Sequence, residues 1–235
     1  MDEVIGQIRM ELESHVDERT KSTGQRFFKE TVRLYGVGSA LVGRIAANSF
    51  QSIASRSKAE IFGLCEELWC SGMLEESFIA CEWAYRLRSR YTPDDILVFE
   101  KWIDTWVDNW ASCDTLCNHS VGSFIVKYPE NSATLKRWTC SDNRWKRRAA
   151  AVSLVVPARK GAFLEELLNI ASLLLEDDDD LVRKGYGWML KEASRTHQDE
   201  VFTFVMQHKA RMPRTALRYA IEKMPSDRKR LAMEK

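Results

Sequence analysis

Residues 141–156, which read SDNRWKRRAAAVSLVV, decide the fold. Ser141 or Asp142 suits a helix N-cap, and neither Gly nor Pro interrupts the residues that follow. Arg144 and Arg148 are four positions apart, so a helix places them on one face. Small and apolar residues recur at helical spacing and can pack inward: Ala149, Val152, Ser153 and Val156. The stretch therefore predicts a helix with one packed side and one cationic side.

The same design recurs twice downstream. Residues 181–195, LVRKGYGWMLKEASR, place one aromatic and three cationic side chains on a single stripe: Lys184, Trp188, Lys191 and Arg195. Residues 211–224, RMPRTALRYAIEKM, place three arginines on one stripe: Arg211, Arg214 and Arg218. Three successive helices with cationic stripes predict a basic, aromatic-studded face that suits a polyanion such as nucleic acid.

Helices are predicted almost throughout the chain, and no stretch alternates as a strand. The predicted segments are residues 3–18, 24–34, 39–48, 58–69, 75–90, 93–106, 109–127, 129–138, 141–156, 162–175, 181–195, 199–208 and 213–224. Basic positions recur at steps of 36 residues, from Arg147 to Arg183, and 31 residues, from Arg183 to Arg214. Helix pairs with a period of about 30–45 residues predict an all-α fold, an α-solenoid of HEAT-like antiparallel helix pairs with a concave basic face.

The length and composition indicate one helical array. The 235 residues suit a single domain over 1–235, with an N-terminal helix in residues 1–20 and a short charged tail in residues 225–235. Only 11 Gly and 5 Pro argue against a turn-rich β architecture. No apolar run could span a membrane, and none of the six cysteines forms a C-x-x-C pair. A cytoplasmic protein with reduced thiols and no membrane association is expected.

A net charge of +1 conceals two unlike halves of the chain. Residues 136–235 carry 21 Lys and Arg against 14 Asp and Glu, a net charge of +7, while residues 1–135 carry 14 against 20, a net charge of −6. A basic half can attract a polyanion even when the whole chain is almost neutral. Long helices that simply expose many Lys and Arg side chains are the alternative explanation.

The predicted helix over residues 109–127 adds a carboxylate. Trp110 and Asp114 are four positions apart and share a face. Four other residues form a stripe that is typical of a buried seam: Cys113, Cys117, Val121 and Phe124. Asp114 therefore lies beside the seam, near a large aromatic side chain. By spacing alone, an Asp that caps a helix or pairs with an Arg of the next helix pair is the simpler interpretation.

Three motifs in register resemble the AlkD-type DNA alkylation repair glycosylases. They are W-x-x-x-D in residues 110–114, SDNxWxxRAA in residues 141–150 and KxxGWxLxE in residues 184–192. The resemblance extends from about residue 26 to residue 223, which is nearly the whole chain. It implies a HEAT-like α-solenoid that excises cationic N3- and N7-alkylated purines, such as 3-methyladenine and 7-methylguanine, from duplex DNA.

The resemblance also implies roles for individual residues. Asp114 matches the catalytic carboxylate, Trp110 and Trp188 match two active-site tryptophans, and Arg148 matches an arginine of the cleft. Phe27 stands where the family commonly has an aromatic residue, often tyrosine, that approaches DNA. The remaining candidates for DNA contacts are basic: Arg44, Arg144, Lys184, Lys191, Arg214 and Arg218. The family is implied to act on a lesion that stays in the duplex stack, without a metal or other cofactor, as a monofunctional hydrolase.

Some features depart from the pattern or allow another explanation. Residues 38–44 hold two glycines and a serine where the family offers polar and basic groups, which weakens that end of the DNA face. Cys113, Cys117 and His119 resemble a metal cluster, but no fourth ligand is evident and no metal is predicted. The acidic run at residues 176–180 is expected to be a solvated loop that caps the next helix.

Gly185 and Gly187 lie inside a predicted helix, where each glycine costs about 1 kcal/mol against alanine. They indicate the close approach of another helix or of DNA. A monomer without an obligate protein partner is expected, with alkylated double-stranded DNA as its ligand. The alternative function is a non-catalytic HEAT-like protein that binds branched or damaged DNA, or one that serves as a protein scaffold.

Overall fold

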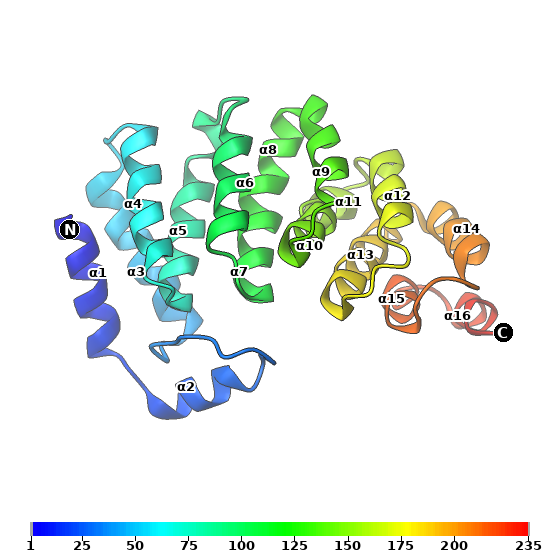
Figure 1. Ribbon diagram of the computed structural model, residues 1–235, viewed down its shortest axis with the longest axis horizontal. Coiled ribbons are helices and arrows are strands. Elements are labelled where there is room, and N and C mark those ends of the chain that lie inside the picture. Colours follow the sequence, from blue (N-terminus) through cyan, green and yellow to red (C-terminus); the bar gives the residue numbers. More distant parts are fainter. Residues whose placement is uncertain (1, 235) are drawn as a thin grey trace. The chain divides into compact units, whose positions relative to one another are not determined.

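The computed structural model describes residues 2–234, and every extended regular element in that range is a helix (Figure 1). The predicted all-α, HEAT-like fold is therefore confirmed. The backbone divides into two compact units, residues 1–116 and residues 117–235. The expectation from the sequence that the chain forms a single domain stays a prediction.

The first unit consists of helices, most of which are joined by short turns. They are α1 (Glu3–Ser14), α2 (Glu18–Gln25), α3 (Ser39–Ile53), α4 (Lys58–Cys70), α5 (Leu74–Arg86), η1 (Arg88–Arg90), α6 (Asp95–Thr105) and α7 (Trp110–Thr115). α5 is central, because it packs against α3, α4 and α7. The indole N–H of the fully buried Trp83 on α5 donates to the carbonyl of Ala46 on α3 at 3.0 Å. Figure 1 shows α3, α4, α5 and α6 side by side.

The predicted helix over residues 24–34 is wrong. α2 ends at Gln25, and residues 26–38, here called the strap, run without a regular helix to the start of α3. The reason is a buried carboxylate on α5. Glu75, which is 4% exposed, accepts hydrogen bonds from the backbone N–H groups of Tyr35 at 3.0 Å, Gly36 at 2.8 Å and Val37 at 3.1 Å. A buried carboxylate with three such donors holds the strap extended more strongly than local helix propensity can oppose.

Gly36 adopts a positive φ within the strap. Its φ is 90°, and it lies within the strap rather than at the end of a helix. A Cβ placed there would lie 2.6 Å from the carbonyl oxygen of Asp17 and 2.7 Å from the Cβ of Lys21. The glycine therefore lets the strap pass directly against the start of α2.

The second unit also stacks helices, and α13 is its central element. Its elements are α8 (Gly122–Lys127), η3 (Pro129–Asn131), α9 (Ser132–Trp138), α10 (Arg144–Val152), α11 (Val155–Arg159), α12 (Leu164–Leu173), α13 (Asp180–Ala193), α14 (Gln198–His208), α15 (Arg214–Ala220) and α16 (Ser226–Met233). α13 packs against α10, α11, α12 and α15. A Cβ on Gly187 would lie 2.8 Å from the Cβ of Tyr219 and 2.9 Å from the carbonyl oxygen of Ala216, so the close approach at Gly187 is that of α15.

Other helix predictions also differ from the structure in detail. The N-terminal helix predicted over residues 3–18, within 1–20, ends at Ser14, and a separate helix, α2, begins at Glu18. The predicted helix over residues 109–127 contains a π-helical segment, η2 (Leu116–Val121), between α7 and α8, and the predicted seam residues are buried. α10 is capped by Asn143 rather than by Ser141 or Asp142, and it ends at Val152 before α11 begins. The predicted charged tail contains α16, because Ala232 is buried and the ammonium of Lys209 binds the carbonyls of Leu231 and Glu234.

Candidate functional site

α7 holds Trp110 and Asp114 one helical turn apart, as the sequence predicts. The buried Asn109 caps this helix, since its side-chain oxygen accepts the backbone N–H of Ser112 at 2.9 Å. Trp110 is the first residue of α7, and both Trp110 and Asp114 are half-buried. The cap fixes where the helix starts, and thereby the direction of both side chains.

The strap fixes the indole of Trp110. The ring of Phe28 stacks on it, with the ring centroids 5.4 Å apart and the planes at 26°. The indole N–H donates to the backbone carbonyl of Phe27 at 3.3 Å. These contacts extend an apolar cluster of Val32 and Leu34 from the strap with Leu74 and Ala111. The orientation of Trp110 therefore depends on the strap, and through it on the Glu75 carboxylate.

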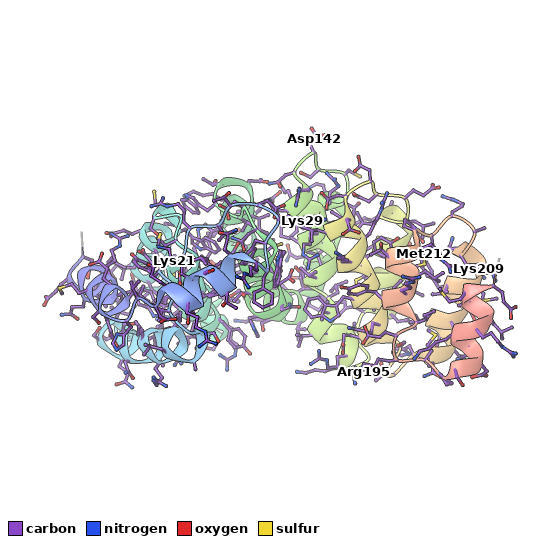
Figure 2. All side chains as sticks on the ribbon, turned by 90° about the horizontal axis from the view of Figure 1, so that it is seen from below. Lys21, Lys29, Asp142, Arg195, Lys209 and Met212 are labelled. Atoms are coloured by element: carbon purple, nitrogen blue, oxygen red, sulfur yellow. The ribbon has the colours of Figure 1, made fainter. Side chains whose placement is uncertain are left out.

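Phe27, the predicted DNA contact, has a side chain that is 69% exposed. It borders a cavity of about 730 Å³ in the first unit, here called the aromatic hollow. The lining comes from α2, the strap, α3, α5 and α7, and consists of Arg19, Thr20, Thr23, Gly24, Phe27, Phe28, Val37, Gly38, Ser39, Leu74, Phe78, Trp110 and Ala111. Figure 2 shows α2 and the strap from below, with Lys21 and Lys29 labelled on them.

α3 presents a sparse polar surface, as the sequence indicates for residues 38–44. Arg44 is exposed, and among residues 2–234 no carboxylate pairs with it. A Cβ on Gly38 or Gly43 would meet nothing within 4 Å. The only predicted cation of this helix is therefore available to a ligand, and the space beside it is open.

Arg148 and Trp188 lie in the second unit, on the packed helices α10 and α13. Arg148 is only 5% exposed, and its guanidinium donates to the backbone carbonyl of Leu181. A Cβ on Gly185 would be 3.4 Å from the Cγ of Arg148, so this glycine leaves room for the arginine side chain. Trp188 follows Gly185 by nearly one turn and is half-buried.

Three of the cations predicted to contact DNA form ion pairs with carboxylates of the second unit. Arg144 lies 3.3 Å from Asp179, Lys184 lies 2.7 Å from Asp180 on the next turn of α13, and Lys191 lies 3.1 Å from Glu222. Arg144 also covers the indole of Trp145, with its guanidinium carbon 4.5 Å from the ring centroid. The cationic stripes exist as helix faces, but much of their charge is neutralised locally.

Residues 176–180, here called the acidic loop, supply most of these counter-charges. In addition to the pairs made by Asp179 and Asp180, Asp177 lies 2.7 Å from Arg147, and Glu176 lies 2.8 Å from Arg211. Asp179 also caps α13 by accepting the backbone N–H groups of Leu181 at 2.8 Å and Val182 at 3.2 Å. The loop does cap the next helix, as the sequence indicates, and it also binds basic residues from three segments.

Arg214 and Arg218 remain exposed on α15. The guanidinium of Arg214 donates to the backbone carbonyl of Met233 at 3.3 Å, and no carboxylate within residues 2–234 pairs with either arginine. Together with Arg44, they are the predicted DNA contacts whose charge is not compensated by an acidic side chain.

The described part of the chain offers no obvious metal centre or membrane span. Within residues 2–234, no three His, Cys, Asp or Glu side chains gather closely enough to hold a metal ion. Cys113 and Cys117 are buried in the seam. None of the helices in that range is long and apolar enough to cross a bilayer.

Sequence reasoning missed Phe28 and Glu75. Phe28 belongs to none of the three motifs, yet it is the ring that stacks on Trp110. Glu75 looks like an ordinary acidic residue in the first turn of a helix, which is the position it occupies in α5. Its role depends on the strap passing by, and no local pattern reveals a contact between residues about 40 positions apart.

A family model described as DNA alkylation repair enzyme matches residues 8–224. The chain belongs to this family. The family is thus one of DNA repair enzymes, and the AlkD-type resemblance agrees with it at that level. A search of the curated proteins found no match.

Among solved structures, the fold is similar to that of a predicted DNA alkylation repair enzyme from Enterococcus faecalis. The TM-score is 0.80 at 15% sequence identity, and the match covers 88% of this chain and 96% of the other. At this identity the similarity shows the fold alone. The similarity in fold extends over almost the whole of that protein.

Proposed function

We propose that the protein hydrolyses the N-glycosidic bond of cationic N3- or N7-alkylated purines in duplex DNA, such as 3-methyladenine and 7-methylguanine. The observation that carries the proposal is α7, whose capped start presents Trp110 and Asp114 one turn apart while the strap clamps the indole. Membership of the DNA alkylation repair family supports alkylated DNA as the substrate.

The chemistry suits these residue types. Alkylation at N3 or N7 places a positive charge on the purine and weakens its bond to C1′ of the deoxyribose. When the bond breaks, its electrons neutralise the base and the sugar becomes an oxocarbenium-like cation. The carboxylate of Asp114 stabilises that cation and orients the water whose oxygen bonds to C1′. The proton that this water loses passes to the carboxylate and from there to solvent.

Tryptophan and arginine supply the remaining roles. Indole faces attract cations by about 0.5–2 kcal/mol each, so Trp110 and Trp188 favour the charged lesion and the charged sugar over undamaged DNA. Arg148 binds a phosphate of the DNA backbone. Contacts to the backbone and sugar let the lesion remain in the duplex stack, so lesion choice depends on charge and lability. We expect no metal and no lysine nucleophile in this step.

The test is release of 7-methylguanine and 3-methyladenine from methylated duplex DNA, by the parent, Asp114→Asn and Arg148→Ala. We expect the parent to release both bases and Asp114→Asn to lose release by orders of magnitude. Asp94→Asn is the matched control, because Asp94 is an exposed aspartate of the same unit whose side chain makes no capping hydrogen bond at the start of α6. Thermal unfolding of each variant separates loss of chemistry from loss of fold.

A second candidate function rests on the ion pairs of the acidic loop. A scaffold that binds DNA or a protein without chemistry has no need of Asp114, and neutralised cations weaken any DNA face. If the parent binds methylated duplex but releases neither base, non-catalytic DNA binding is the better function. If it neither binds duplex nor releases a base, a protein-scaffold function is favoured.

A further inference from the structure

The aromatic hollow is an unusual feature for an exposed surface. Four aromatic side chains line it, from three different parts of the first unit: Phe27 and Phe28 on the strap, Phe78 on α5 and Trp110 on α7. Phe27 keeps 69% of its surface exposed. Exposed aromatic rings beside an open cavity are typical of a site for a flat, apolar ligand.

The polar part of the lining favours an anion over a cation. Arg19 contributes a guanidinium, and none of the lining residues carries a carboxylate. The 15-residue helix α3 also begins at the rim, where Gly38 is the N-cap and no side chain caps the helix. The positive end of the helix dipole therefore adds to the charge of Arg19.

The space is open rather than filled by the chain. A Cβ on Gly38 would have no neighbour within 4 Å, and Thr20 and Thr23 line the α2 side of the hollow with short hydroxyl side chains. A cavity of about 730 Å³ has ample room for one purine and an attached sugar phosphate.

We propose that the aromatic hollow binds a nucleobase that lies outside the duplex stack. Aromatic rings stack on any base, and the guanidinium and helix terminus complement a phosphate attached to it. The inference deepens the proposed function and rests on it for the identity of the ligand as DNA. Trp110 connects the two sites, since it lines the hollow and stands one turn before Asp114 on α7.

The charge of the hollow suits the base after cleavage better than before. An alkylated purine in DNA is cationic, and Arg19 repels it. Loss of the glycosidic bond leaves the bonding electrons on the purine, so the freed base is neutral and can stack on Phe27. The same chemistry also accepts an uncharged nucleotide that is still part of the strand but has left the stack, and an experiment separates the two sources.

The probe is 2-aminopurine, a fluorescent purine whose emission is quenched by stacking. One arm adds it to the protein as a free base, and the other presents it as a single unpaired nucleotide in an otherwise undamaged duplex. The variants are Phe27→Ala, which removes the exposed ring, and Thr23→Trp, which fills the hollow from an exposed position on α2. Leu97→Ala is the matched control, because Leu97 is 61% exposed on α6 and lies outside the lining.

We expect the parent and Leu97→Ala to quench the probe, and both hollow variants to bind it about fivefold more weakly or worse. Quenching of the free base alone identifies the released base as the ligand, while quenching of the duplex probe alone identifies an unstacked nucleotide. Arg19→Gln should then weaken the duplex arm more than the free-base arm. No quenching in either arm, or equal quenching by the parent and both hollow variants, overturns the proposal.

This outcome is independent of the glycosylase test. Base release that persists without any quenching leaves hydrolysis standing and removes the nucleobase site. Quenching that persists without base release leaves the nucleobase site and removes the hydrolysis.

Discussion

Single glycines and carboxylates decide several of the packing arrangements in this molecule. Gly187 lets α13 and α15 approach until only a hydrogen fits between them, whereas Gly43 on α3 faces open space. Both glycines lie inside helices, but only at Gly187 does the packing require the absence of a side chain. Glu192 on α13 is an equally individual case, because it is buried and accepts hydrogen bonds from Arg159 and Arg195 at 2.7 Å each.

Gly187→Ala should destabilise the protein. The added methyl would lie 2.8 Å from the Cβ of Tyr219 and 2.9 Å from a backbone carbonyl of α15, so the two helices must move apart. We expect a loss of about 1–3 kcal/mol of unfolding free energy, measured by urea denaturation. Gly43→Ala is the control and should gain about 0.5–1 kcal/mol, because the helix gains propensity without a clash. Equal effects of the two changes would contradict the packing at Gly187.

Glu192→Gln should show a pH-dependent loss of stability. Burial raises the pKa of Glu192, but the hydrogen bonds from Arg159 and Arg195 outweigh it, so the pKa lies below the ordinary 4.5. A carboxyl group whose pKa is lowered by folding stabilises the folded state at pH values above its pKa in the unfolded chain. This contribution disappears as the pH falls through the pKa of the folded state. The variant should lose about 1–3 kcal/mol at neutral pH. The difference from the parent should shrink in urea titrations performed below the ordinary pKa.

Exposed Glu165 on α12 gives the comparison for this pH series. Glu165→Gln should change the unfolding free energy by less than about 0.5 kcal/mol at neutral pH, because surface substitutions of this kind have small effects. A stability gap for Glu192→Gln that stays constant down to acid pH would show that shape, and not charge, is what Glu192 contributes.

The acidic loop and the strap show how much of the site depends on whole elements. The acidic loop places carboxylates beside basic residues of α10, α13 and the segment before α15. These carboxylates take the places beside the cations that DNA phosphates would otherwise take. The strap holds the indole of Trp110 in place, although about 80 residues separate Phe27 from Trp110 in the sequence. In both elements the chain itself supplies the partner of a candidate functional residue.

Neutralising the acidic loop should strengthen duplex binding. Glu176→Gln with Asp180→Asn removes the carboxylates that pair with Arg211 and Lys184. The released cations can then contact phosphates, so fluorescence anisotropy with duplex DNA should give a lower Kd and a steeper salt dependence, by about 0.9 per added contact on a log–log plot. The comparison is Glu165→Gln with Asp227→Asn, which removes two exposed carboxylates of the second unit. Equal gains in both double variants would mean that only net charge matters.

At the scale of the whole molecule, charge is divided unequally along the chain. The net charge is only +1, although residues 136–235 carry +7 and residues 1–135 carry −6. Within residues 136–235, internal ion pairs neutralise much of the positive charge, whereas the exposed Arg214 and Arg218 keep theirs. Arg44, in the other part of the chain, is also exposed and keeps its charge. The protein should therefore bind DNA through few phosphate contacts.

The salt dependence of duplex binding tests this view. Phosphate contacts by the three uncompensated arginines predict a log–log slope of roughly −2.7, at about −0.9 per contact. Replacing any one of these arginines by Gln should reduce the magnitude of the slope by about 0.9, which corresponds to one phosphate contact. A flat slope, or no binding at low salt, would favour a protein partner over DNA.

Helical spacing was sufficient to predict most of the helices. Cys113, Cys117, Val121 and Phe124 form the buried seam that their spacing indicates, and Trp110 and Asp114 do share a face of α7. These predictions succeed because they depend on neighbours three or four positions apart, whose relative placement a helix determines. The three motifs led to the family for the same reason, since each is read within one short segment.

Tertiary structure alone decided where those helices find their partners. The strap is extended rather than helical because the Glu75 carboxylate on α5 takes three of its backbone N–H groups. Lys191 of the cationic stripe on α13 is neutralised because Glu222, 31 positions away in the sequence, approaches it in space. Gly187 admits α15 rather than DNA. The amino-acid sequence by itself determined the helices and the faces they present, because a helix is a local structure, whereas the pairing of buried and charged groups from distant segments was settled only when the chain packed.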